Sequence, residues 1–316
     1  MKLNDNFPRE GILAALTLPC DPDGRPLETA LSDHLGWLKD RGIHGVLGLG
    51  STGEFPLLSV DERKSVLETV AGLAAPLPVI ANISDIRPKV VAELGRFARE
   101  LGLPGVAVMP PSFFPVSAAD QLAFFEFAAE AAQLPVLLYN FPELTGNRID
   151  LETISAFADR GPMAGIKQSG REFAYHHELI ALGREKDFRV FSGADTRLPE
   201  VFGLGAAGCI GGFVNFVPEL MVEQFKTFRN GGSGPLEPVV SRMRRVGAIV
   251  DRVKFPLNVA AGITARGFNP GSPKSIISRE TQVLFTGVVE ELRECFREWK
   301  LEPFHGTGMT EPLARN

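Results

Sequence analysis

The sequence has few of the residues on which disulfide, metal and nucleic-acid chemistry depend. Among 316 residues there are only three cysteines and five histidines, and the formal net charge is -5. The cysteines, Cys20, Cys209 and Cys295, lie far apart and form no CxxC pair, so they predict free thiols. The histidines show no metal-ligand spacing, and the basic residues are scattered along the chain. These features give no indication of a metal and argue against nucleic acid as a partner.

Long apolar runs are also missing. A membrane-spanning helix needs about 18 or more consecutive apolar residues, and the sequence has no such stretch. A secretory signal needs an apolar segment behind a basic start, whereas residues 1–10 include Asp5 and Glu10. We therefore expect a cytoplasmic protein without a membrane anchor.

Short apolar runs alternate with amphipathic segments at intervals of roughly 20 to 30 residues, which is typical of repeated βα units. Eight strands are expected, at residues 11–18, 45–49, 78–82, 105–109, 135–139, 163–167, 188–192 and 207–211. Helical periodicity occurs between them, at residues 27–41, 60–72, 88–101, 118–133 and 151–160. Ser59 and Asp150 are suited to begin two of these helices. This pattern predicts a closed (β/α)8 TIM barrel.

An open doubly wound sheet is the alternative fold for such a pattern. That fold calls for a glycine-rich turn after the first strand, but residues 19–24 (PCDPDG) contain no phosphate-binding pattern, so the barrel is preferred. A loop-forming segment at 230–235 (NGGSGP) precedes a mostly helical stretch. We expect residues 1–230 to form the barrel that carries the active site. Residues 231–316 should form a C-terminal helical appendage that ends in a weakly ordered tail from residue 302.

Two residues that end apolar strands could carry chemistry, because TIM-barrel active sites lie at the carboxyl ends of the strands. Lys167 follows the apolar run 163–166, and burial would favour its neutral, nucleophilic amine. Tyr139, one of only two tyrosines, follows the run 135–138 and could carry a proton. Each also has a simpler interpretation, since Lys167 could begin a solvated loop and Tyr139 could be a core aromatic residue.

The segment 50–54 (GSTGE) follows the second predicted strand. Gly50, Ser51 and Thr52 offer approachable N–H groups and two hydroxyls, a set of donors that suits a carboxylate. A Ser/Thr/Gly turn is also a common way to begin a helix, so the segment has two interpretations when it is taken alone.

Taken together, three segments resemble the dihydrodipicolinate synthase / N-acetylneuraminate lyase family of class I aldolases and dehydratases. The segments are 50–54 (GSTGE), 139–146 (YNFPELTG) and 165–167 (GIK), and they occur in the family's order and at its usual spacing. The resemblance extends over roughly residues 8 to 300. It implies a (β/α)8 barrel with C-terminal helices, a homotetramer built as a dimer of dimers, and neither a metal nor an organic cofactor.

The resemblance also implies roles for the residues already described. Lys167 would form an imine with the keto carbon of a 2-keto acid such as pyruvate, and Tyr139 would relay protons beside it. Ser51 and Thr52, with Gly50, would hold the carboxylate of the keto acid.

Further residues are candidates to line the substrate pocket. Asp195 could accept hydrogen bonds from substrate hydroxyls or, equally, cap the following helix. Ile210 would pack over the bound keto acid or belong to the plain core. Ser112, Glu143 and Gln168 are candidates for recognition of the substrate tail, although all three could be ordinary loop residues.

Two departures from the family pattern bear on the substrate. Leu144 stands where dihydrodipicolinate synthases usually have an arginine, and leucine cannot replace a bidentate carboxylate partner. Residues 110–115 (PPSFFP) lack the tyrosine that reaches the neighbouring subunit in those synthases. Both changes favour a lyase, an aldolase or dehydratase, that yields pyruvate from a 2-keto-3-deoxy sugar acid or an N-acetylneuraminate-like substrate. The alternatives are a condensation of pyruvate with an aldehyde, an inactive keto-acid-binding relative, and a phosphate-ester isomerase that uses the glycine-rich segment 208–212.

Overall fold

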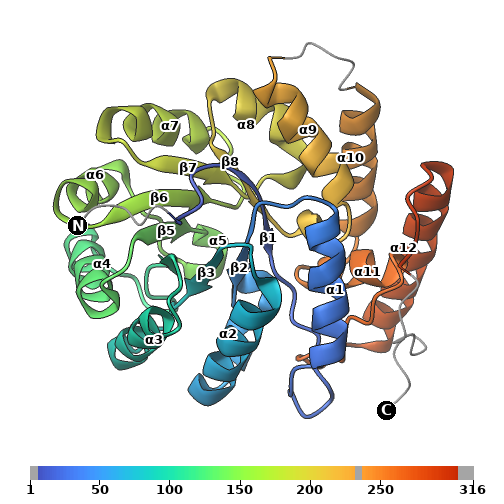
Figure 1. Ribbon diagram of the computed structural model, residues 1–316, viewed down its shortest axis with the longest axis horizontal. Helices are drawn as coiled ribbons and strands as arrows, with labels where there is room; N and C mark the ends of the chain where they lie inside the picture. The colour runs from blue at the N-terminus through green and yellow to red at the C-terminus, as the bar shows by residue number, and fades with distance from the viewer. Residues whose placement is uncertain (1–5, 232–236, 305–316) are drawn as a thin grey trace.

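The computed structural model describes residues 6–231 and 237–304, and its centre is a closed barrel of eight parallel strands in sequence order (Figure 1). The strands are β1 (Gly11–Ala15), β2 (Gly45–Gly48), β3 (Val79–Asn82), β4 (Gly105–Val108), β5 (Val136–Asn140), β6 (Met163–Gln168), β7 (Arg189–Ser192) and β8 (Gly208–Gly211). β1 pairs with both β2 and β8, so the sheet has no open edge. The predicted (β/α)8 barrel is confirmed.

Helices surround the barrel on the outside (Figure 1). They are α1 (Glu28–Asp40), α2 (Val60–Ala74), α3 (Pro88–Glu100), α4 (Ala118–Ala132), α6 (Leu151–Arg160), α7 (Tyr175–Lys186), α8 (Leu198–Leu204) and α9 (Pro218–Arg229). The Ser59 side chain accepts a hydrogen bond from the Glu62 N–H in a capping box, and the Asp150 side chain caps α6 by accepting from the Thr153 N–H. Both predicted helix starts are confirmed.

Several short helical segments follow the strands at their carboxyl ends. They are η1 (Ser51–Gly53), η2 (Phe55–Leu57), α5 (Pro142–Thr145), η3 (Asp195–Arg197) and η4 (Phe213–Asn215). The carboxyl ends of the strands are the catalytic end of this architecture.

The core has two parts because successive strand residues point to opposite faces of the sheet. One cluster fills the barrel interior and includes Leu13, Leu47, Leu137, Tyr139 and Ile210. Their sequence neighbours point outward and pack against the surrounding helices in a second, larger cluster. The interior is therefore packed with side chains, and Tyr139 belongs to it.

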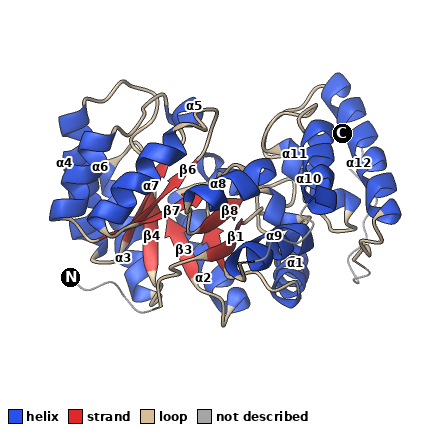
Figure 2. Cartoon of the chain, turned by 90° about the horizontal axis from the view of Figure 1, so that it is seen from above, coloured by secondary structure: helices blue, strands red, loops and turns tan. Residues whose placement is uncertain are grey.

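Three further helices form a group on one side of the barrel (Figures 1 and 2). They are α10 (Glu237–Val250), α11 (Leu257–Ala265) and α12 (Arg279–Glu298). α10 contacts η3 and α11 contacts η4, so this group lies against the mouth of the barrel at β7 and β8. The predicted C-terminal helices are confirmed. The division at residue 230 stays a prediction, and most of the loop at 230–235 and of the tail lies outside the described residues.

The three cysteines are free and buried. Burial raises the pKa of each thiol, so all three remain protonated and unreactive.

Within the described ranges, no helix is both long and apolar enough to cross a membrane.

Candidate active site

Lys167 and Tyr139 meet inside the carboxyl end of the barrel. They are register partners on the neighbouring strands β6 and β5. Lys167 Nζ donates a hydrogen bond to Tyr139 Oη at 3.1 Å and lies 4.2 Å from the centre of its ring. Only 3% of Lys167 and 1% of Tyr139 are exposed. The structure thus brings together the two residues that were predicted to carry the chemistry, in a place sheltered from water.

The 50–54 turn adjoins this pair. Its Ser51 Oγ lies 2.8 Å from Tyr139 Oη. The N–H groups of Gly53 and Glu54 bond back to Gly50 O and Ser51 O, which makes the turn helical. The first N–H groups of a helical turn, here those of Ser51 and Thr52, have no partner inside the turn and suit an anion. The turn therefore presents donors next to Tyr139.

Asp195 begins η3 at the end of β7 and reaches across to β8. Its carboxylate accepts hydrogen bonds from the Phe213 N–H at 3.0 Å and from Cys209 Sγ at 3.4 Å. Burial raises the pKa of Asp195, and the hydrogen bonds and the positive charge of Lys167 partly oppose this rise. The alternative in which Asp195 caps the next helix is wrong, because α8 begins after Arg197 without a side-chain cap.

Ile210 and the glycines of β8 contribute to the packing of the barrel. Ile210 pairs in register with Leu13 and belongs to the interior cluster of the barrel, while its contact with a substrate stays a prediction. A Cβ atom at Gly208 would lie 2.0 Å from Gly11 O, and one at Gly211 would collide with Asp195. Close strand approach therefore explains the glycine-rich segment 208–212, and the phosphate-site interpretation loses its support.

Two of the predicted tail-recognition residues form hydrogen bonds within the protein. Gln168 is fully buried, and its Oε1 accepts a hydrogen bond from Asn140 Nδ2 at 2.7 Å while its amide donates to Ser169 O. Both ends of its side-chain amide therefore have hydrogen-bond partners within the protein, which differs from the predicted contact with a substrate tail. Glu143 is exposed on α5 and accepts from the Arg171 N–H at 2.6 Å.

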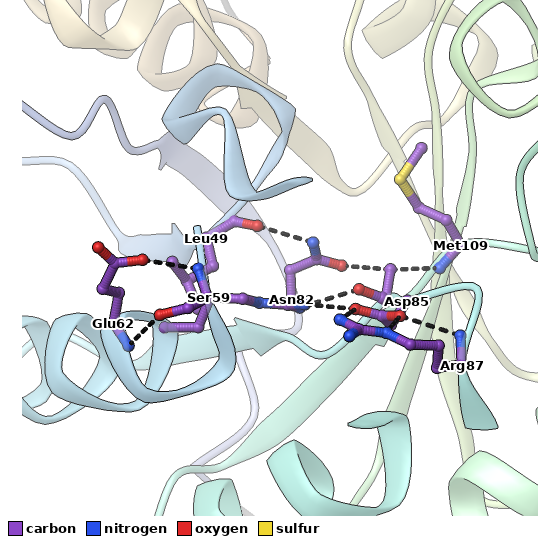
Figure 3. Close-up of polar contacts among 9 residues, drawn as sticks. Leu49, Ser59, Glu62, Asn82, Asp85, Arg87 and Met109 are labelled. Atoms are coloured by element: carbon purple, nitrogen blue, oxygen red, sulfur yellow. Dashed lines mark hydrogen bonds and ion pairs between the residues drawn. The ribbon is translucent and has the colours of Figure 1, made fainter. Parts of the chain in front are cut away.

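A buried polar network at the ends of β2, β3 and β4 was not predicted (Figure 3). Asn82 Nδ2 donates to Leu49 O at 2.7 Å, and Asn82 Oδ1 accepts from Ser84 Oγ. Ser84 Oγ also accepts from the Met109 N–H at 2.8 Å, and Ser84 O accepts from Arg63 at 2.9 Å. Asn82 ends an apolar run just as Tyr139 and Lys167 do, and that position was the available signal in the sequence.

A second unpredicted contact joins the C-terminal helices to the same turn. Lys274, between α11 and α12, donates to Leu18 O at 2.7 Å and pairs with Glu54 at 3.1 Å. The side chains of Lys274 and Glu54 are only 8% and 20% exposed. Both residues line a small cavity between the barrel and the C-terminal helices, which Thr52 also lines.

The comparisons with known proteins agree over most of the chain. Residues 8–283 match the dihydrodipicolinate synthetase family. YagE of Escherichia coli strain K12, described as a putative 2-dehydro-3-deoxy-D-gluconate aldolase, is 32% identical over 70% of this chain and 74% of its own length. A DapA-like lyase of Halobacterium salinarum is 29% identical over 84% of this chain and 87% of that protein.

Solved structures have the same architecture. The crystal structure of YagE in complex with pyruvate gives a TM-score of 0.83 at 25% identity, and it covers 90% of this chain and 98% of YagE. A Ruminococcus gnavus sialic acid aldolase gives a TM-score of 0.82 at 21% identity over 92% of this chain and 99% of that one, a likeness that shows the fold alone. On the family match over residues 8–283, the chain belongs to the dihydrodipicolinate synthetase family, and it is a lyase.

Proposed function

We propose that the protein is either an aldolase that releases pyruvate or a dehydratase, and that it acts on a 2-keto acid bound as a Schiff base to Lys167. The observation that carries this proposal is the continuous contact from Lys167 Nζ through Tyr139 Oη to Ser51 Oγ. This row of contacts supports the assignment of Lys167 as the nucleophile, Tyr139 as the proton carrier and Ser51 as one end of the carboxylate site. The pyruvate bound in YagE gives the class of ligand.

In the first half of the reaction, the neutral Lys167 amine attacks the keto carbon. Ser51 and Thr52 hold the adjacent carboxylate through hydroxyl and backbone donors. Tyr139 supplies a proton to the oxygen of the carbinolamine, which leaves as water and gives the protonated imine.

In the second half, the imine accepts the electrons of the bond that breaks. For an aldolase, Tyr139 removes the proton of the C4 hydroxyl, the C3–C4 bond breaks, and an aldehyde leaves. The resulting enamine takes up a proton at C3, and water then hydrolyses the imine to release pyruvate and restore Lys167. For a dehydratase, a proton leaves C3 and the C4 hydroxyl leaves as water instead.

Three observations support a 2-keto-3-deoxy sugar acid as the substrate. Leu144 is 48% exposed where a synthase would need an arginine for a second carboxylate. Asp195 lies in electrostatic range of Lys167, and its carboxylate can accept hydrogen bonds from sugar hydroxyls. YagE, described as a putative aldolase for such an acid, is 32% identical over 70% of this chain.

The decisive experiment is borohydride reduction in the presence of pyruvate, read by intact-mass spectrometry. We expect one pyruvyl adduct, mapped to Lys167 and absent from Lys167→Ala. Lys89→Ala, which removes an exposed lysine on α3, is the matched control and should still be labelled.

Two outcomes would redirect the proposal. Pyruvate that binds to folded protein without forming any adduct would favour a relative that only binds keto acids. If the adduct forms, pyruvate release from 2-keto-3-deoxygluconate and from N-acetylneuraminate identifies a lyase reaction, whereas product formed only from pyruvate and an aldehyde identifies a condensation.

A further inference from the structure

Leu49, the residue between β2 and the 50–54 turn, has an unusual backbone conformation. Its φ is 56°, in the left-handed region that costs free energy for any residue with a Cβ atom. The side chain is buried. Such a conformation persists only where the surroundings hold it, and it is often found beside functional sites.

Asn82 stabilises this backbone conformation of Leu49. Its side chain is completely buried at the end of β3, and its Nδ2 donates to Leu49 O at 2.7 Å. Ser84 Oγ donates to Asn82 Oδ1 and accepts from the Met109 N–H, so both ends of the amide are engaged (Figure 3). This arrangement fixes which way the amide points and therefore where Leu49 O must lie.

The direction of the chain after Leu49 decides where the donors of the turn lie. Ser51, only two residues later, brings its Oγ within 2.8 Å of Tyr139 Oη. A change of φ at Leu49 to an ordinary negative value would redirect the chain that leaves β2. Ser51 and Thr52 would then move away from the pair that Tyr139 forms with Lys167.

We propose that Asn82 is a positioning residue that keeps the 50–54 turn in the form that binds the substrate carboxylate. This inference rests on the proposed function, because it takes that turn as the carboxylate site. Asn82 acts through Leu49 O and does not need to touch the substrate.

The expected effect is on binding of the keto acid. Without Asn82, we expect the fraction of molecules whose 50–54 turn has the binding form to fall to about one in ten. The apparent affinity for the keto acid should fall by the same factor. Saturating substrate selects the competent form, so KM rises about tenfold while kcat stays within about twofold.

The test compares three substitutions. Asn82→Leu keeps the branched shape at Cγ but has no hydrogen-bonding groups. If this larger side chain prevents folding, Asn82→Ser is used in its place. Ser84→Ala removes the contact that orients the amide but keeps the bond from Asn82 to Leu49, so it should change affinity less than Asn82→Leu does. Gln121→Leu removes a buried amide that bonds backbone carbonyls outside the turn, and it controls for a general loss of stability.

Two readouts are needed. The first is the pyruvate concentration that gives half-maximal borohydride trapping at Lys167, which should rise about tenfold in Asn82→Leu only. The second is amide hydrogen exchange of residues 48–57 without pyruvate, which should become about tenfold faster in the same variant.

The outcomes separate this inference from the proposed function. An Asn82 variant with unchanged trapping affinity and unchanged exchange in the turn overturns the inference while the Schiff-base function stands. If the unsubstituted protein is never trapped, the proposed function fails. Hydrogen exchange then still decides whether Asn82 shapes the turn.

Discussion

His34 is a single buried residue whose titration should affect the stability of the whole barrel. It lies on α1 with its ring 4.9 Å from that of Phe268, and its Nε2 lies 2.7 Å from Asn215 O. Asn215 in turn bonds the backbone of Ala15 and Thr17 at the end of β1. Burial lowers the pKa of His34 from 6.5 to about 4, which the hydrogen bond only partly opposes.

The sign of the pH effect follows from this lowered pKa. Below pH 6.5 the unfolded chain takes up a proton that the folded protein refuses until about pH 4, so the free energy of unfolding falls as the pH drops through this window. A shift of this size corresponds to about 3 kcal/mol over the whole window.

We expect His34→Gln to flatten that dependence, because glutamine can keep a donor toward Asn215 O but does not titrate. Urea unfolding at about pH 7 and about pH 5 should show a smaller loss of stability for this variant than for the unsubstituted protein. His177→Gln, at an exposed position on the same barrel, is the control. Equal losses for His34→Gln and the unsubstituted protein would refute the assignment.

At the same scale, the sequence indicated Lys167 and Tyr139 but not Asn82. All three end apolar runs, yet only the first two are residue types with obvious chemistry at such a position. The role of Asn82 depends on a carbonyl 33 residues away, and periodicity carries no information about that contact. Gln168 was misjudged for a related reason, since its partner Asn140 lies on a different strand.

At the scale of elements, the strands and helices were predicted well where the pattern was local. The capping box at Ser59 and the cap at Asp150 fixed two helix starts to the residue. β1 ends at Ala15 rather than at residue 18, although the apolar run continues. The reason is tertiary, because the Thr17 N–H bonds Asn215 Oδ1 instead of a neighbouring strand. The single turn α5 is too short to show a helical period.

The loop between α11 and α12 joins the C-terminal helices to the barrel. The Ser272 N–H donates to Cys20 O at 2.7 Å, and Lys274 bonds Leu18 O and Glu54. Glu54 ends the η1 turn, so the ion pair connects a distant part of the chain to the proposed carboxylate site. The two charges are 220 residues apart in sequence, and no local pattern could have paired them.

We expect Lys274→Met to lower the free energy of unfolding by about 2 kcal/mol, because it leaves the Glu54 carboxylate largely buried and unpaired. The double variant Glu54→Gln/Lys274→Met should recover at least half of that loss. Urea denaturation of the two single variants and the double variant gives the coupling energy.

The surface pair of Lys186 with Asp159 serves as the comparison, and its Lys186→Met variant should lower stability less than Lys274→Met does, because solvent screens the exposed pair. A Lys274→Met variant no less stable than Lys186→Met would show that the buried pair contributes nothing to docking.

At the scale of the whole molecule, one loop presents apolar side chains that no other described part of the chain covers. Phe113 and Phe114, after β4, are 83% and 66% exposed, and their rings pack edge to face at 4.8 Å. The loop is held in place, because Asn147 Nδ2 donates to both Pro111 O and Phe114 O. Phe113 also has a φ of 79°, a strained value for a residue with a side chain.

An anchored, strained and exposed aromatic pair is typical of a protein contact surface. The segment corresponds to the one from which related synthases extend a tyrosine toward the neighbouring subunit, so we infer that this pair packs against a second copy of the chain. We expect the protein to be a tetramer built as a dimer of dimers, and Phe113→Ser/Phe114→Ser to shift it to smaller species with an unchanged circular dichroism spectrum.

Light scattering after gel filtration at about 10 µM protein measures the mass, a concentration at which an interface of ordinary affinity is saturated. Ile276→Ser, which removes a fully exposed apolar side chain in the C-terminal region, is the matched control and should leave the mass unchanged. A monomeric unsubstituted protein would contradict the predicted assembly. A double variant that stays tetrameric would place the contact elsewhere, and the two phenylalanines would then need another partner to explain their exposure.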